Sequence, residues 1–333
     1  MILNPAVVAL VGSSALICGL ALLAAGAGLT VVAGWDPGDS GPRQLARERR
    51  SFLVEAVLTM VLGCQLASLF LFVATTEHLH GLFTGAMCAA GTLNASSFGY
   101  PTLLLKLQVF GLCGLWVVAN RATASAASTG LIRFKYLSLL PLAGGLVAEN
   151  ILQYRYFASL EPDIITSCCA SIFSERASGL GAELAAMPAA ACRVAFLAGL
   201  GTVLGAGALV LLSRRSPEPY AALALPFGVL SMAAVVSWVG PAFYQLPNHH
   251  CPFCLLAPDH HYVGYPLYAA LAVAVVTGSG SGIVHRLRSI DPLGCIRPAE
   301  ERRLCVASMI GFAVFALIAL WPVAATIYRT GGK

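Results

Sequence analysis

Apolar residues form long uninterrupted stretches along this chain, separated by short polar segments. A bilayer core about 30 Å thick requires roughly 20 apolar residues in each helix that crosses it. The segments between the stretches are too short for a separate soluble domain, so the pattern predicts one membrane domain over residues 1–333, an all-α polytopic bundle of about eight transmembrane helices. The predicted spans are 6–35, 52–75, 102–120, 136–154, 191–212, 220–243, 264–284 and 304–327.

The composition agrees with a chain that lies in lipid. Of the 333 residues, 58% are hydrophobic and only 11% are charged, whereas a soluble domain has about 25% charged residues. A single solvent-facing globule is therefore excluded. The formal net charge of +5 does not indicate nucleic-acid binding, because the basic residues are confined to particular loops. The expected partner is the lipid bilayer.

Basic residues mark one side of the predicted bundle. Most of the 20 Lys and Arg residues fall in alternate loops, and the other loops and the termini contain few of them. By the positive-inside rule, the Arg-rich loops are cytoplasmic. An even number of spans then places both termini on the extracytoplasmic side. The Arg-rich loops are 36–51, 121–135, 213–219 and 285–303.

The candidate chemistry lies in the three longer loops on the opposite side, 76–101, 155–190 and 244–263. We expect these loops to converge into one cap rich in cysteine and histidine. Thiolates and imidazoles are the side chains that bind zinc and copper, and paired cysteines also carry redox chemistry. The histidines in these loops are His78, His80, His249, His250, His260 and His261, and the cysteines are Cys88, Cys168, Cys169, Cys251 and Cys254.

The sharpest motif in the cap is Cys251-Pro252-Phe253-Cys254. Two cysteines separated by two residues can close a disulfide or share a metal ion. A proline beside the first cysteine suits the opening of a helix, where the helix dipole lowers the pKa of a thiol. We therefore expect Cys251 to be the more exposed nucleophile at a helix start, with Cys254 as its partner.

Three interpretations of the cap remain open. In the first, Cys251 and Cys254 cycle between dithiol and disulfide, and Cys168, Cys169 or Cys88 relays the electrons. In the second, the chain is a metal-ion transporter or metal-handling protein that binds zinc or copper. In the third, static disulfides tie the loops together in a structural subunit of a membrane complex. The metal ligands of the second interpretation are His78, His80, Cys88, His249, His250, His260 and His261 together with the two cysteines of the motif.

At Cys251-Pro252-Phe253-Cys254-Leu255-Leu256 the sequence resembles the vitamin K epoxide reductases and the disulfide-bond-forming membrane oxidoreductases. The resemblance implies that the motif opens a transmembrane helix at the outer face, beside a bound quinone. It favours a membrane thiol–disulfide oxidoreductase as the first choice of function. The electron partner would be a quinone or an extracytoplasmic thioredoxin-like protein.

Three charged residues lie within the predicted spans, near their outer ends. Charges at membrane depth are costly and are normally paired or functional. Glu149 could pair with Lys106 or with Arg193. The functional alternative is a polar cavity beneath the cysteine loops that holds a quinone headgroup or guides an ion. Lys106, Glu149 and Arg193 are therefore candidate cofactor-binding residues.

Overall fold

The described part of the chain is helical almost throughout. The computed structural model describes residues 1–36, 38, 41–124, 128–161, 165–166, 187–213, 215–290 and 296–330, with side chains up to residue 322 in the last range. Within these ranges the only extended pairing is a single β-bridge between Thr84 and Ile165. Eight helical segments are long and apolar enough to cross a membrane. The predicted all-α polytopic membrane bundle is thus confirmed.

The eight segments coincide with the predicted spans, and the main difference is at α2 (Pro42–Leu79). This helix begins well before residue 52, so that Arg43, Arg47, Arg49 and Arg50 lie on its first turns. Arginine, glutamine and glutamate are good helix formers, and the helix therefore continues beyond the apolar stretch. The length of an apolar stretch reflects the thickness of the bilayer core, whereas helix propensity determines the residue at which the helix begins.

The helices form two compact units. The division is not visible in the hydropathy pattern because its boundaries fall within helices: α2, α12 (Gly264–Ser289) and α13 (Pro298–Thr330) each contribute to both units. Unit 1 comprises Met1–Thr75, Ser96–Glu161 and Ile283–Glu301, and unit 2 comprises Thr76–Ala95, Pro162–Gly282 and Arg302–Lys333.

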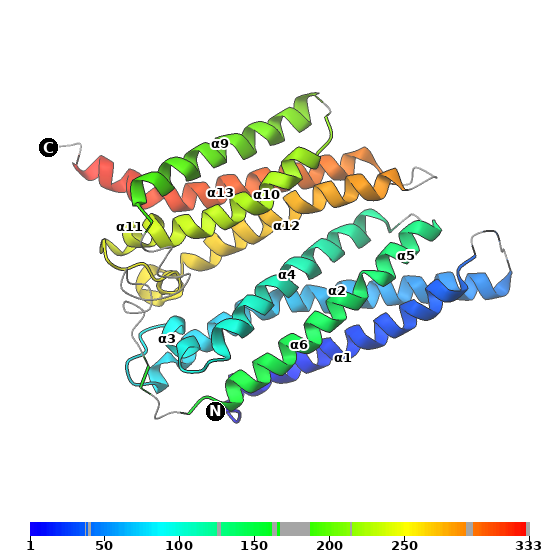
Figure 1. Ribbon diagram of the computed structural model, residues 1–333, viewed down its shortest axis with the longest axis horizontal. Coiled ribbons are helices and arrows are strands. Elements are labelled where there is room, and N and C mark those ends of the chain that lie inside the picture. The colour runs from blue at the N-terminus through cyan, green and yellow to red at the C-terminus, as the bar shows by residue number, and fades with distance from the viewer. Residues whose placement is uncertain are drawn as a thin grey trace. The chain divides into compact units, whose positions relative to one another are not determined.

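Unit 1 is built from α1 (Pro5–Gly34), most of α2, α4 (Gly99–Ala122), α5 (Thr129–Leu137) and α6 (Leu139–Ala158) (Figure 1). Helix α6 packs against both α1 and α4. The apolar core of the unit draws side chains from all five helices. Members that are fully or almost fully buried include Leu62, Val109, Trp116, Tyr136 and Leu146.

Unit 2 is built around α9 (Ala189–Ser213), α10 (Glu218–Ala234), α12 and α13 (Figure 1). An aromatic core joins three of these helices: the Phe227 ring lies 5.6 Å from that of Phe196 and 5.0 Å from that of Phe312, measured between centroids. Helix α10 continues through a π-helical turn, η2 (Val235–Val239), into α11 (Gly240–Tyr244). The loops carry the short elements η1 (His80–Leu82), α3 (Ala89–Asn94), η3 (Cys254–Leu256) and η4 (Pro258–His260).

Candidate functional site

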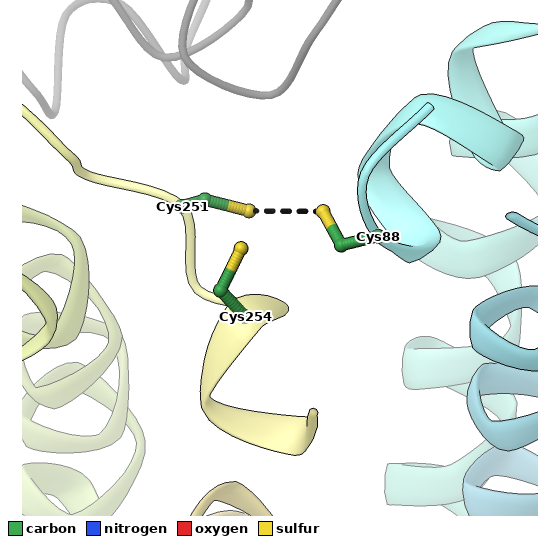
Figure 2. A group of neighbouring side chains, drawn as sticks. All are labelled: Cys88, Cys251 and Cys254. Carbon is green, nitrogen blue, oxygen red and sulfur yellow. Dashed lines mark hydrogen bonds between the residues drawn. The ribbon is translucent and has the colours of Figure 1, made fainter. Parts of the chain in front are cut away.

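Three cysteines of unit 2 meet in one cluster, which we call the thiol cluster: Cys88, Cys251 and Cys254. Their Sγ atoms all lie within 4.8 Å of one another, and those of Cys88 and Cys251 are 3.6 Å apart. Figure 2 shows the three sulfur atoms facing one another, with Cys88 at the start of α3, Cys251 on the loop that leads into η3, and Cys254 at the first position of η3. Residues 163 positions apart in the chain thus share one site.

Cys88 is held in place by the end of α2. Cys88 is the N-cap residue of α3, and its carbonyl oxygen accepts a hydrogen bond from the Gly91 N–H. The next N–H group, that of Ala89, donates to the carboxylate of Glu77 at 2.6 Å. A carboxylate at this position satisfies a helix N–H that has no partner within the helix. Glu77 thereby fixes the backbone from which the Cys88 thiol projects.

The loop that bears Cys251 and Cys254 is held by two tyrosines. The Tyr244 hydroxyl donates to the Cys251 carbonyl oxygen at 2.5 Å, and the Tyr268 hydroxyl donates to the Pro252 carbonyl oxygen at 2.6 Å. These tyrosines come from α11 and α12, on either side of the loop in sequence. The backbone of the motif is therefore anchored to two helices of unit 2.

Two expectations about the motif are corrected. Cys251 does not open a transmembrane helix: it precedes the single turn η3, and α12 begins only at Gly264. Cys251 is also not the more exposed thiol, since its side chain is 1% exposed whereas Cys254 is half-buried. The cause is local, because Cys251 packs with Cys88, Ala90 and Val236 in a small apolar cluster.

Two of the predicted histidines adjoin the thiol cluster. Nε2 of His249 lies 3.2 Å from Sγ of Cys254. Nδ1 of His250 lies 2.9 Å from the carbonyl oxygen of Val236, and so donates its proton to that oxygen. Val236 belongs to the π-helical turn η2, and such turns are frequent at functional sites.

The other predicted histidines do not join the cluster. His78 is exposed at the end of α2. The ring of His80 contacts the Glu77 carbonyl oxygen and lies 3.8 Å from the Glu77 carboxylate. His261 is exposed, with a positive φ of 52°. The His260 ring packs against Tyr244 at 4.7 Å, and burial lowers the pKa of His260 despite the opposing charge of Asp259.

The first two cap loops are joined by backbone contact. The Thr166 N–H donates to the Thr84 carbonyl oxygen at 2.9 Å. Next to it, Gly85 has a φ of +91°, and a Cβ atom at this position would collide with the Thr166 carbonyl oxygen. Glycine is therefore required here both for its conformation and for the space it leaves.

The remaining predicted cysteines are placed as follows. Cys168 and Cys169 lie outside the described residues. Of the cysteines that the structure describes, none forms a disulfide.

The three candidate cofactor-binding residues are not one group. Lys106 and Glu149 form a buried ion pair in unit 1, with Nζ 2.5 Å from Oε1. Arg193 belongs to unit 2, where its guanidinium lies over the Trp238 ring at 5.4 Å. Of the two predicted partners of Glu149, Lys106 is the one that pairs with it. The polar groups around this pair come from the helices of unit 1.

Sequence reasoning missed several residues that these sites use. Tyr244 and Tyr268 support the motif, and no spacing rule identifies a hydroxyl that meets a loop carbonyl. Gln65 on α2 donates to both carboxylate oxygens of Glu149, at 2.9 and 2.8 Å. The only indication of Gln65 in the sequence was its polar side chain within an apolar span.

Comparison of the chain with protein-family models, curated proteins and solved structures found no match. The geometry of the thiol cluster is therefore what indicates its chemistry. Three thiols in mutual reach with an imidazole beside one of them can bind a thiophilic metal ion, or can exchange disulfides among themselves.

Proposed function

We propose that the chain is a metal-handling membrane protein whose thiol cluster binds a thiophilic ion, zinc or copper(I). The observation that carries the proposal is the mutual approach of the Cys88, Cys251 and Cys254 sulfur atoms within 4.8 Å. Zinc–sulfur bonds of about 2.3 Å at tetrahedral angles hold two sulfurs about 3.8 Å apart. The 3.6 Å between Cys88 and Cys251 agrees with that spacing.

The His249 imidazole contacts Cys254 and would supply a fourth ligand by moving closer to Cys88 and Cys251, because the ligand atoms within 4.8 Å of one another are the three sulfurs alone among the described residues. Its Nε2 atom lies 3.2 Å from Cys254 Sγ, close to the separation of two ligands on one ion. Three thiolates and one imidazole form a closed tetrahedral site, which zinc favours, whereas copper(I) is satisfied by the softer thiolates alone. The second nitrogen of the His249 ring would then carry the proton.

Burial supports a metal ion over exchange with external thiols. Cys88 is 0% and Cys251 is 1% exposed, so a second protein has no direct access to either sulfur. With the Arg-rich loops in the cytoplasm, the site would face the extracytoplasmic side.

The test is metal analysis of the purified protein in detergent, combined with alkylation of thiols before and after the ion is chelated. We expect one zinc or copper ion per chain, with Cys88, Cys251 and Cys254 protected until chelation. Cys251→Ser should lose the ion. The matched control is Cys192→Ser, because Cys192 is equally buried in unit 2 but lies outside the cluster. Immediate alkylation of metal-free cluster thiols, or an ion retained by Cys251→Ser, would refute the proposal.

Thiol–disulfide exchange is the second candidate function, favoured by the contact between Cys88 and the Cys251–Cys254 pair. In this case Cys254, the more exposed thiol, attacks the disulfide of a thioredoxin-like partner and releases one partner thiolate. Cys251 then attacks the Cys254 sulfur, which releases the second partner thiolate and closes a Cys251–Cys254 disulfide. Two electrons pass to the partner, and Cys88 can reopen the new disulfide. A membrane quinone would serve as an alternative electron acceptor.

The two candidates differ in their dependence on histidine. For a metal site, His249→Gln removes a ligand and should weaken binding about as much as loss of one thiol, whereas exchange activity should tolerate the change. A Cys251–Cys254 disulfide that is reducible in the isolated protein, without bound metal, would establish exchange. His261→Gln, at an exposed position of the same loop, is the control.

A further inference from the structure

Unit 1 contains a separate group of buried polar side chains around Lys106 and Glu149. Besides its contact with Glu149, the Lys106 ammonium donates to the Ser68 hydroxyl at 3.1 Å. Gln65 donates to both oxygens of the carboxylate. Lys106 is 1% exposed and Glu149 is fully buried. We call these four side chains the Lys106–Glu149 centre.

The centre is not explained by stability alone. Lys106 lies seven residues beyond the start of α4. At a rise of 1.5 Å per residue this places it about 10 Å along the helix axis, within the apolar span. Transfer of both charges from water costs about as much as their attraction returns, and well-packed apolar side chains often stabilise a protein equally well. Ionisable side chains at membrane depth typically mark ion or proton pathways.

The hydrogen bonds within the centre are incomplete. An ammonium group has three protons, and Ser68 and Glu149 accept two of them. The Gln65 carbonyl oxygen is buried and has no partner among the described residues. Gln153 lies one turn beyond Glu149 on α6, is 1% exposed, and has neither its amide oxygen nor its amide nitrogen bonded within the described chain.

A further unbonded group comes from α1, which packs against α6. The Ser14 hydroxyl is fully buried and also has no partner in the described chain. Each unbonded buried polar group destabilises the folded state.

We propose that bound water completes the Lys106–Glu149 centre and makes it a proton-exchange site within unit 1. Two carbonyl oxygens require donors, while an amide N–H and the third ammonium proton require an acceptor. Water provides both, and buried water typically makes about three hydrogen bonds to such groups. The site therefore takes a molecule that both donates and accepts hydrogen bonds.

Water beside the ion pair gives its protons a way to exchange. A proton leaves the Lys106 ammonium and reaches the Glu149 carboxylate through a bound water, which leaves a neutral amine and a neutral carboxylic acid. In the return step the amine takes a proton from water, and the carboxylic acid gives its proton back to that water. Protons are exchanged, and the net charge of the centre is unchanged throughout.

The chain offers a direct measurement because its lysines are Lys106, Lys135 and Lys333 alone. With 15N-lysine as the sole label, ammonium signals can be assigned through Lys106→Met and Lys135→Met. After transfer of the detergent-solubilised protein into D2O, the Lys106 signal should exchange on the same timescale as that of Lys135. Lys135 is the matched control, since it forms another buried ion pair in unit 1, 2.9 Å from Glu55.

Gln153→Leu removes the side-chain amide that would bond to the water, without changing a charge. Loss of a hydrogen bond worth about 1.4 kcal/mol to the bound water should slow Lys106 exchange about tenfold, and Lys135 exchange should be unaffected. Thermal unfolding supplies a second readout: a hydrated site predicts a lower Tm for Gln153→Leu, whereas a dry site predicts a higher one. A Lys106 signal that persists long after Lys135 has exchanged, or a raised Tm in the variant, would overturn the proposal.

Discussion

The two units of this protein hold their buried polar groups by different means. In unit 1, Lys106, Glu149 and Gln65 project from three long helices, so the packing of those helices brings them together. In unit 2, the thiol cluster is built on loops, whose backbone is held by individual hydrogen bonds from Glu77, Tyr244 and Tyr268. Disruption of the first group should therefore affect the folding of the unit, whereas disruption of the second should affect mainly ligand binding.

The largest expected effect is on the stability of unit 1. Lys106→Met leaves the Glu149 carboxylate buried without its counter-ion, and removal of one partner of a buried pair costs about 3–5 kcal/mol. We expect a large drop in the thermal or denaturant midpoint of the detergent-solubilised protein, with metal content per folded chain unchanged.

The double variant Lys106→Met/Glu149→Met sharpens this prediction. It removes both charges together, so most of the lost stability should return. A double variant as unstable as Lys106→Met would show that the other hydrogen bonds of the centre, and not the unpaired charge, account for the effect.

The second prediction addresses the loop that supports Cys88. Gly85→Ala places a side chain at a φ of +91° and against the Thr166 carbonyl oxygen, and such strain costs about 1–3 kcal/mol. If the thiol cluster binds metal, the strain should appear as an affinity about tenfold weaker, since about 1.4 kcal/mol corresponds to tenfold in affinity. Competition with a chromogenic chelator measures this change.

Gly81→Ala is the matched control for that experiment. Gly81 lies in the same loop, and a Cβ atom there would have open space around it. Equal losses in the two variants would mean that the loop tolerates no side chain for reasons unrelated to its contact with Thr166.

The contrast between the units also explains what the sequence could predict. All eight spans follow from the length of the apolar stretches, because lipid requires every backbone group to be bonded within its own helix. The pairing of Lys106 with Glu149 was predicted as one of two alternatives, from charge and depth alone. The sequence also placed Cys88, Cys251 and Cys254 together as candidate ligands of one cap, but the direct contact of Cys88 with Cys251 depends on the path of two loops and on a cap from Glu77, which no local pattern predicts.

The same limit explains the errors at the motif. A C-P-x-C pattern predicts a helix start, but Tyr244 and Tyr268 bond to the Cys251 and Pro252 carbonyl oxygens and hold this segment outside the helix. Cys251 is buried against Cys88, Ala90 and Val236, and Val236 lies in a π-helical turn. Neither contact has a signature in local sequence spacing.

The third prediction tests the hydrogen bond from Ala89 to Glu77. Glu77→Gln replaces a charged acceptor with a neutral one, and caps of this kind contribute about 1 kcal/mol. We expect metal affinity to fall by about fivefold, with the midpoint of global unfolding almost unchanged. His78→Gln, at the adjacent exposed position, should leave the affinity as it is. A fall in the unfolding midpoint without a fall in affinity would contradict the assignment of Glu77 to the site.

The smallest expected effect is the pH dependence contributed by His260. Burial lowers the pKa of His260 in the folded protein, so in the range between that lowered value and about 6.5 the unfolded chain binds more protons than the folded one. The stabilising contribution is present above about pH 6.5 and is lost as the pH falls through the folded pKa. Thermal midpoints of the metal-free protein between pH 5 and 8 should show this slope, and His260→Gln should flatten it.

Asp259→Asn should act in the opposite direction, because the Asp259 charge raises the pKa of His260. Without this charge the pKa of His260 falls further, and stability is lost over a wider pH range. A profile that Asp259→Asn flattens would mean that another group controls the pH dependence of this loop.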